Sequence, residues 1–191
     1  MSSPLPRKKR VLIGATGSVA SIKIPLLVKK LLENENVEVK VVCTKAALHF
    51  FDATKVENVI TDEDEWSAWN QMSDPVLHIK LRDWADICVI APLDANTLAK
   101  IANGLCDNLL TCILRAWDLT RPVVVCPAMN TNMWDHPFTN KHLKVLTEEL
   151  RMEVIQPISK TLACGDTGVG AMEEYNKIAQ RILDKLNLSE S

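Results

Sequence analysis

The chain has 191 residues, of which 47% are hydrophobic, and a formal net charge of −2. This length suits a single domain that buries roughly 70% of its extended-chain surface. Without a basic excess to neutralise phosphates, the composition argues against binding to nucleic acid or to a membrane surface. No uninterrupted apolar run reaches the roughly 20 residues of a membrane helix, so a membrane protein is not expected.

The first residues form a tail rich in Ser, Pro and basic side chains. We expect residues 1–9 to be a solvated arm, residues 10–187 a single domain and residues 188–191 a flexible end. A targeting signal is the alternative for the basic cluster 7–10, but Gly14 and Gly17 break the apolar run that a secretory signal would need. The six cysteines include no CxxC pair, so we predict no metal site and a cytoplasmic location.

Strands and helices are predicted to alternate along the chain. Strand patterns cover residues 10–15, 37–44, 86–92, 122–126 and 153–156. Helical spacing covers residues 24–31, 95–102, 109–117, 141–150 and 173–186. Pro25 should kink the first helix or give it a 3₁₀ start. The alternation predicts an α/β fold with one doubly wound parallel sheet and helices on both faces, of the Rossmann or flavodoxin kind.

Function is then expected in the loops that follow the strands. The loop 14–18 after the first strand has two glycines and two hydroxyls before a helix, which suits a phosphate. A tight turn with Ser18 as helix cap explains the same residues equally well. The loop lacks a full GxGxxG, and no acidic residue follows the second strand to hold a ribose, so a dinucleotide-binding oxidoreductase is disfavoured.

Two later loops add polar and sulfur side chains at the same edge. Asp94 follows the third strand and could cap the next helix, while the amides of its loop could hold a flat polar ring. Asn130 follows the fourth strand between Met129 and Met133. Its alternative role is to cap a helix that begins near Thr131, and core packing is the alternative for the two methionines.

Five motifs together resemble the flavin-containing cysteine decarboxylases. In chain order they are Gly14-x-x-Gly17-Ser18-Val19-Ala20, Ala91-Pro92-Leu93-Asp94-Ala95-Asn96-Thr97-Leu98, Cys106-Asp107-Asn108-Leu109-Leu110, Pro127-Ala128-Met129-Asn130 and Cys164-Gly165-Asp166-x-Gly168-x-Gly170-Ala171-Met172. The resemblance extends from residue 11 to about residue 182. Each motif has modest specificity, but the set in this order is highly specific.

The resemblance implies a cofactor, an assembly and a set of site residues. The cofactor is FMN, and the assembly is a homotrimer with the flavin near a subunit interface. The implied flavin contacts are Gly17, Ser18, Val19, Ala20, Thr44, Lys45, Ala46, Phe50, Asp94, Ala95, Asn96, Thr97 and Ala128. The implied substrate contacts are Asn130, Met133, Lys160, Ala171 and Met172, and the implied catalytic residues are His78, Asn130 and Cys164.

The resemblance also implies the reaction, which is decarboxylation of 4′-phosphopantothenoylcysteine to 4′-phosphopantetheine in coenzyme A biosynthesis. Flavin oxidation of the CH₂–SH group gives a thioaldehyde, CO₂ leaves, and the enethiol is reduced again without NAD(P)H. His78 is expected to move protons and Cys164 to protonate the enethiol. A structural histidine and an inert thiol are the alternatives. Lys160 is the one basic residue just before the cysteine loop, which leaves phosphate recognition open.

Other functions on a similar scaffold stay open. One is a non-catalytic regulatory subunit, for example of a protein phosphatase, although such a protein is expected to lack a catalytic residue. Others are a decarboxylase of peptidyl cysteine and a flavin prenyltransferase. The Cys164 loop argues against the prenyltransferase.

Overall fold

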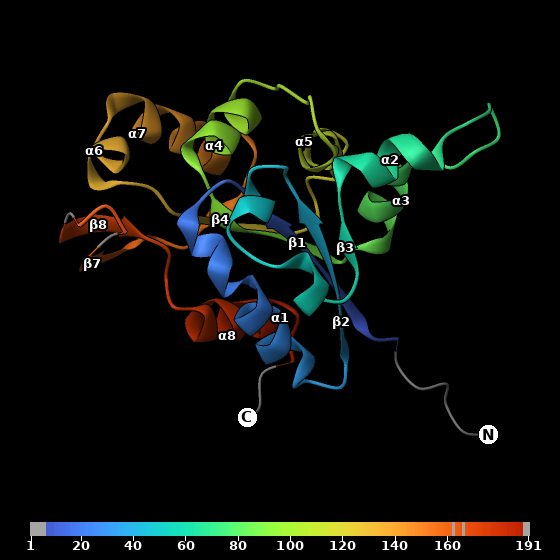
Figure 1. Cartoon of the computed structure of the whole chain (residues 1–191), viewed down its shortest axis with the longest axis horizontal. Coiled ribbons are helices and arrows are strands. Elements are labelled where there is room, and N and C mark those ends of the chain that lie inside the picture. The colour runs from blue at the N-terminus through green and yellow to red at the C-terminus, as the bar shows by residue number, and fades with distance from the viewer. Residues whose placement is uncertain (1–6, 162, 166, 189–191) are drawn as a thin grey trace.

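The computed structural model describes residues 7–161, 163–165 and 167–188. Its centre is a six-stranded parallel sheet with the order β3-β2-β1-β4-β5-β6 (Figure 1). The strands are β1 Lys9–Ala15, β2 Val37–Cys43, β3 Val59–Ile60, β4 Ile87–Leu93, β5 Val123–Pro127 and β6 Glu153–Val154. This confirms the predicted doubly wound sheet, whose strand order reverses between β1 and β4.

Helices cover both faces of the sheet (Figure 1). The helices α1 Ile24–Leu32 and α8 Tyr175–Lys185 pack on one face, where Leu27 and Ile178 share a core with Ile13 of β1. On the other face Leu12 shares a core with residues of α3 Leu77–Trp84, α4 Ala95–Ala102 and α5 Leu109–Arg115. Successive residues of β1 thus enter opposite cores, as expected for a strand buried on both faces.

Prolines set the start of two helices. The 3₁₀ helix η1 Val19–Lys23 precedes α1, and Pro25 lies in the first turn of α1, where a missing N–H costs little. The predicted 3₁₀ start is therefore confirmed. The helix α7 Pro137–Lys144 begins four residues before the predicted 141 because Pro137 opens it, and it continues into the π-helical turn η4 Val145–Glu149.

The structure contains elements that the sequence patterns did not predict. They are the edge strand β3, the 3₁₀ turns η2 Ala47–His49 and η3 Ala53–Lys55, the helices α2 Asp62–Ala68 and α3, and the antiparallel strands β7 Ile158–Thr161 and β8 Thr167–Ala171. The short helix α6 Thr131–Trp134 is the one that the capping alternative for Asn130 predicts. Every residue of α2, which is described in full, is at least partly exposed. An exposed polar helix has no apolar stripe to reveal it, and β7 is mostly exposed as well.

The β7–β8 hairpin is fastened to the segment after β5. The Met129 N–H donates to the carbonyl of Gly170 at 2.9 Å. Gly170 has a φ of 149°, and a Cβ there would lie 2.2 Å from the Met129 oxygen, so only glycine allows this approach. The contact brings the chain around Cys164 to the edge of the sheet where the strands end. None of the helices in the described part of the chain is long and apolar enough to cross a membrane.

Candidate active site

Asp94 ties together the loops that follow β1 and β4. Its carboxylate accepts the Gly17 N–H at 2.9 Å through Oδ2 and the Thr97 N–H at 2.7 Å through Oδ1. Thr16 adds a second link, because its hydroxyl donates to the Pro92 carbonyl and accepts the Asp94 N–H, both at 2.8 Å. Asp94 therefore does cap α4, and the same carboxylate also fixes the backbone at the point where the strand order reverses.

The loop after β2 joins the same edge. A Cβ on Gly17 would lie 2.7 Å from the Ala46 Cβ, so the two backbones pack closely there. The Thr44 N–H donates to the Ala15 carbonyl at 3.0 Å, which holds the end of β2 beside β1. In the same loops Lys45 and Asn96 are exposed, whereas Ala95 and Phe50 are half-buried.

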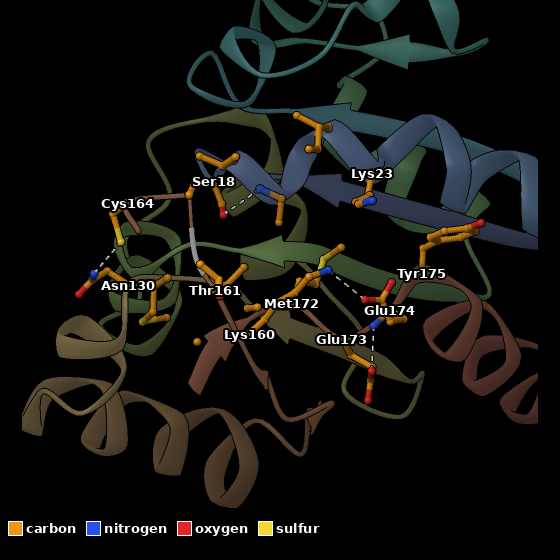
Figure 2. Close-up of a pocket in the computed structure, with 18 residues that line it drawn as sticks. Ser18, Lys23, Asn130, Lys160, Thr161, Cys164, Met172, Glu173, Glu174 and Tyr175 are labelled. Carbon is orange, nitrogen blue, oxygen red and sulfur yellow. Dashed lines mark hydrogen bonds and ion pairs between the residues drawn. The ribbon is translucent and has the colours of Figure 1, made fainter. Parts of the chain in front are cut away.

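A cavity of about 360 Å³ opens between this edge and the hairpin (Figure 2). Its walls include nine of the predicted site residues: Ser18, Val19, Ala20, Ala128, Asn130, Lys160, Cys164, Ala171 and Met172. We call it the hairpin pocket. Figure 2 shows Asn130 and Cys164 at one end and Tyr175 at the opposite end. The volume is in the range of small-molecule and cofactor sites.

Asn130 makes two different contacts at that end. Its Oδ1 accepts the Asn132 N–H at 2.8 Å and so caps α6, as the capping alternative predicts. Its Nδ2 donates to the Sγ of Cys164 at 3.2 Å (Figure 2). The cap therefore engages one end of the carboxamide, and the other end reaches the exposed thiol. The two residues are 34 apart in sequence, and the hairpin brings them together.

Charged groups that the sequence analysis did not identify also line the hairpin pocket. Lys23 ends η1, and Glu173 and Glu174 precede α8. The Lys160 ammonium pairs with the Glu174 carboxylate at 3.3 Å (Figure 2). Lys23 ends a 3₁₀ helix, in which residues three apart rather than four apart share a side, so its spacing from Val19 gives no sequence signal for this position.

His78 lies elsewhere in the chain. It belongs to α3 and lines a second cavity of about 510 Å³, which we call the helix pocket, between α2, α3 and the start of α5. The other lining residues are Asp62, Glu65, Trp66, Trp69, Val76, Leu77, Cys106, Asp107, Asn108, Leu109 and Cys112. The helices α2 and α3 lie at the opposite end of the molecule from β7 and β8 (Figure 1). One copy of the chain thus separates His78 from Asn130 and Cys164.

Met133 is also apart from the hairpin pocket. It lines a cavity of about 480 Å³ beside α7, together with Phe138 and His142. The Met133 side chain is 48% exposed, so packing in the core does not explain it. Met129, in contrast, is buried, and its core-packing alternative is observed.

The thiols differ in environment. Burial raises the pKa of Cys43 and of Cys88 to about 12, and burial also raises the pKa of Cys126. These three lie buried in β2, β4 and β5, where a free Cys behaves as a small hydrophobe. In the helix pocket, burial first and the nearby Glu65 carboxylate second raise the pKa of Cys112 to about 11. Such thiols are poor nucleophiles at neutral pH.

Comparison with known proteins defines the class. A family model described as "Flavoprotein" matches residues 2–187, and the chain belongs to this family of flavoproteins. It is 59% identical to phosphopantothenoylcysteine decarboxylase of Arabidopsis thaliana, over 91% of this chain and 83% of that protein. It is 54% identical to phosphopantothenoylcysteine decarboxylase of Mus musculus, over 92% of this chain and 86% of that protein.

Comparison with solved structures supports the same class of protein. A phosphopantothenoylcysteine (PPC) decarboxylase mutant with serine for cysteine, complexed with pantothenoylaminoethenethiol, superposes with a TM-score of 0.91 at 55% identity and covers 95% of this chain and 100% of that chain. The FMN binding protein AtHal3 superposes with a TM-score of 0.87 at 54% identity and covers 97% of this chain and 100% of that chain. The peptidyl-cysteine decarboxylase EpiD superposes with a TM-score of 0.73 at 25% identity and covers 92% of this chain and 99% of that chain.

Proposed function

We propose that this protein is an FMN-dependent carboxy-lyase that converts 4′-phosphopantothenoylcysteine to 4′-phosphopantetheine. The observation that carries the proposal is the Asn130–Cys164 pair in a cavity lined by the loops after β1 and β5. The high identity to phosphopantothenoylcysteine decarboxylases over nearly the whole chain supports this substrate. The lower identity to the peptidyl-cysteine decarboxylase disfavours a peptide substrate.

The chain's residues fit FMN at this edge. No Cβ fits at Gly17, because Ala46 and the Asp94 carboxylate fill that space, so the loops after β1, β2 and β4 pack tightly into one frame at this edge. The apolar side chains of Val19 and Ala128 in the hairpin pocket suit a flat ring. The remaining residues that would hold the cofactor are Ser18, Ala20, Thr44, Lys45, Phe50, Ala95, Asn96 and Thr97. When bound, FMN accepts two electrons and a proton from the substrate and later returns them, so no nicotinamide is needed.

The protein's own groups position the substrate and move its protons. Direct loss of CO₂ from an N-acylated cysteine would leave an unstabilised carbanion. In the thioaldehyde the carboxylate is β to a C=S group, so the electron pair released with CO₂ is delocalised onto sulfur as an enethiolate. We assign Asn130 to the substrate carboxylate, through the Nδ2 that reaches Cys164. Cys164 then gives a proton to the α-carbon of the enethiol.

Lys160 and Lys23 are the cations that we assign to the substrate phosphate, because both line the hairpin pocket. Lys160 already pairs with Glu174, so phosphate binding there competes with a carboxylate. We place Ala171 and Met172 against the pantothenoyl chain, since both line the same cavity. Met133 lines a different cavity, so its contact with substrate depends on a second copy of the chain.

We further propose that the working enzyme is a homotrimer whose sites are shared between subunits. His78 and the Asn130–Cys164 pair line separate cavities, and α3, which carries His78, lies at the opposite end of the molecule from β7 and β8, so one copy does not complete the site (Figure 1). Large apolar side chains around the helix pocket are exposed, with Trp66 at 78% and Trp69 at 49%. Val19 and Ile22 are likewise exposed at the hairpin pocket. Apolar surface of this kind marks an interface.

The test of activity uses the purified protein with its bound flavin. We expect a flavin spectrum and release of CO₂ from phosphopantothenoylcysteine without added nicotinamide. A peptide with a carboxy-terminal cysteine serves as the competing substrate. A colourless, inactive protein would contradict the proposed function, and faster turnover of the peptide would contradict the substrate. The mass of the active particle in solution, by light scattering, tests the trimer, and a fully active monomer would contradict it.

We also propose a cytoplasmic location. Three cysteines are buried as thiols inside the sheet and its cores, which suits a reducing compartment. Cell fractionation with a tagged full-length chain tests this, and recovery from an oxidising compartment would contradict it. The domain limits 10–187 stay a prediction, which limited proteolysis tests.

A further inference from the structure

A histidine–carboxylate pair lies in the helix pocket. The Nδ1 of His78 is 2.5 Å from the Oε1 of Glu65, between α3 and α2. Both side chains are largely covered, with 15% of Glu65 and 27% of His78 exposed. A carboxylate so close and so covered orients the ring far more strongly than one on an open surface.

The chemistry of the pair determines which ring nitrogen carries the proton. An ionised carboxylate only accepts hydrogen bonds, so the Nδ1 of His78 must donate its N–H to Glu65. The Nε2 then remains as the atom that takes up or releases a proton. In other enzymes a buried carboxylate holds a catalytic imidazole in this way, in one tautomer and one orientation.

We propose that Glu65 is a positioning residue that holds His78 as the Nδ1–H tautomer, with Nε2 left to exchange protons in the reaction. This inference rests on the proposed function, because it takes His78 as the group that moves protons. Glu65 itself does not touch the substrate in this account. It acts through the imidazole.

The helix that carries Glu65 is itself held in place. Its first turn has a capping box in which the Asp64 carboxylate accepts the Thr61 N–H at 2.7 Å. The Asp62 carboxylate accepts the Leu109 N–H at 2.8 Å and so joins α2 to the start of α5. Asp62 and Glu65 are three residues apart and both line the helix pocket, so the bond to α5 also fixes the face that carries Glu65.

The same pocket offers a competing interpretation. The ligand atoms of Glu65, His78 and Cys112 lie within 4.8 Å of one another and could hold a metal ion such as zinc. Each of these groups already has a partner in the protein, because Nδ1 of His78 bonds to Glu65 and the Cys112 thiol donates to the Cys106 carbonyl at 3.3 Å. The geometry therefore favours a hydrogen-bonded pair, and bound zinc becomes an outcome of the test.

The test compares FMN-loaded Glu65→Gln with Glu63→Gln. Glu63 lies on the same helix but is exposed and does not line the pocket. We expect Glu65→Gln to lower kcat by about 10- to 100-fold with little change in KM and in flavin content. The Glu63→Gln control should match the wild type. Glu65→Asp, which keeps the carboxylate on a shorter stem, should recover part of the loss.

A direct readout of the tautomer keeps the test independent of how the variants fold. Nitrogen-15 NMR of the ring in the unsubstituted protein should show His78 as Nδ1–H, and Glu65→Gln should mix the tautomers. An Nε2–H ring in the unsubstituted protein, or an unchanged kcat in Glu65→Gln, would overturn the inference. Stoichiometric zinc that disappears in Glu65→Gln would also overturn it. If His78→Asn keeps its turnover, the assumed role of His78 fails instead, which separates the two failures.

Discussion

The hairpin pocket and the helix pocket are built from different parts of the fold. The walls of the hairpin pocket are loops at the carboxyl ends of β1 and β5, closed by the β7–β8 hairpin. The helix pocket is built from α2, α3 and the start of α5. The helices α2 and α3 lie at the opposite end of the molecule from β7 and β8 (Figure 1). The first holds the Asn130–Cys164 pair and the second holds the Glu65–His78 pair.

On the proposed assignment, proton transfer is divided between two places in one chain, the Asn130–Cys164 pair and His78. Asn130 and Cys164 line the hairpin pocket together with the loop after β1, whereas His78 lines the separate helix pocket. In the proposed homotrimer, assembly is part of catalysis, since a second copy brings its helix pocket to the hairpin pocket. Separate variants in the two pockets should thus fail at separate stages of the reaction.

The largest expected effect comes from His78→Asn and Cys164→Ser, one in each pocket. A proton donor or acceptor contributes about 10²- to 10⁴-fold, so each variant should lose turnover by that order. His78→Asn should stop CO₂ release while the protein stays yellow. Cys164→Ser should release CO₂ once and leave the flavin reduced. Rapid mixing with substrate, followed by the flavin absorbance and by trapped CO₂, distinguishes the two stages.

Two results would contradict this division of proton transfer between the two pockets. One is Cys164→Ser with a flavin that reoxidises normally in the absence of oxygen, and the other is substantial turnover in His78→Asn.

The next effect concerns the two ends of the Asn130 carboxamide. Asn130→Asp keeps a good helix cap but removes the N–H donor to Cys164, whereas Asn130→Ala removes both. We expect both variants to lose turnover by at least about tenfold. Only Asn130→Ala should also lose stability, by about 1 kcal/mol. Steady-state kinetics and urea unfolding measure the two quantities, and full turnover in Asn130→Asp would leave Asn130 as a cap alone.

A third prediction concerns the docking of the hairpin. Gly170→Ala would force a Cβ to within 2.2 Å of the Met129 carbonyl, so the hairpin must shift away from Asn130. We expect lower turnover and a stability loss of about 1–3 kcal/mol. Gly104→Ala is the matched control, because Gly104 also has a positive φ but no atom within 4 Å of its Cβ position. Equal losses of turnover and stability in Gly170→Ala and Gly104→Ala would show that backbone strain, rather than the clash with Met129, causes them.

The smallest effect lies outside both pockets, at Glu153, the first residue of β6. Burial alone would raise the pKa of Glu153, but hydrogen bonds and charges from Arg181 and Lys185 outweigh it and lower that pKa below its usual 4.5. The folded pKa is depressed, so this stabilisation is present above about pH 4.5 and is lost as the pH falls through the folded value.

Glu153→Gln should therefore flatten the acid limb of the stability curve, by about 1 kcal/mol or less. Turnover near neutral pH should not change, because Glu153 lines neither pocket. Unfolding by urea at several pH values measures the effect. A loss of turnover at neutral pH would show that α8 couples to the hairpin pocket.

The sheet edge could be predicted from sequence because each functional loop follows a buried apolar strand. Residues 18–20, Asp94 and Asn130 all come directly after such strands, and parallel strands end at one edge. The capping alternatives for Asp94 and Asn130 were also sound, since both side chains cap helices. In each case the same side chain makes a second contact that local sequence does not reveal.

The helix pocket could not be predicted in the same way. Glu65 and His78 are 13 residues apart on two helices, and their contact depends on how α2 packs against α3. The residues of α2 form no buried apolar stripe, so the sequence has no helical periodicity that would predict this helix. The Asn130–Cys164 contact likewise depends on the fit of Gly170 against Met129, which is a tertiary property.

Mixing two inactive variants tests the shared site most directly. His78→Asn and Cys164→Ser subunits are combined in equal amounts, dissociated and reassembled with FMN. If each site takes His78 from one subunit and Cys164 from its neighbour, about a quarter of the sites in random hybrids contain both groups. Turnover should therefore return to about that fraction of the turnover of the unsubstituted enzyme. A mixture that exchanges subunits but stays as inactive as its parents would contradict it.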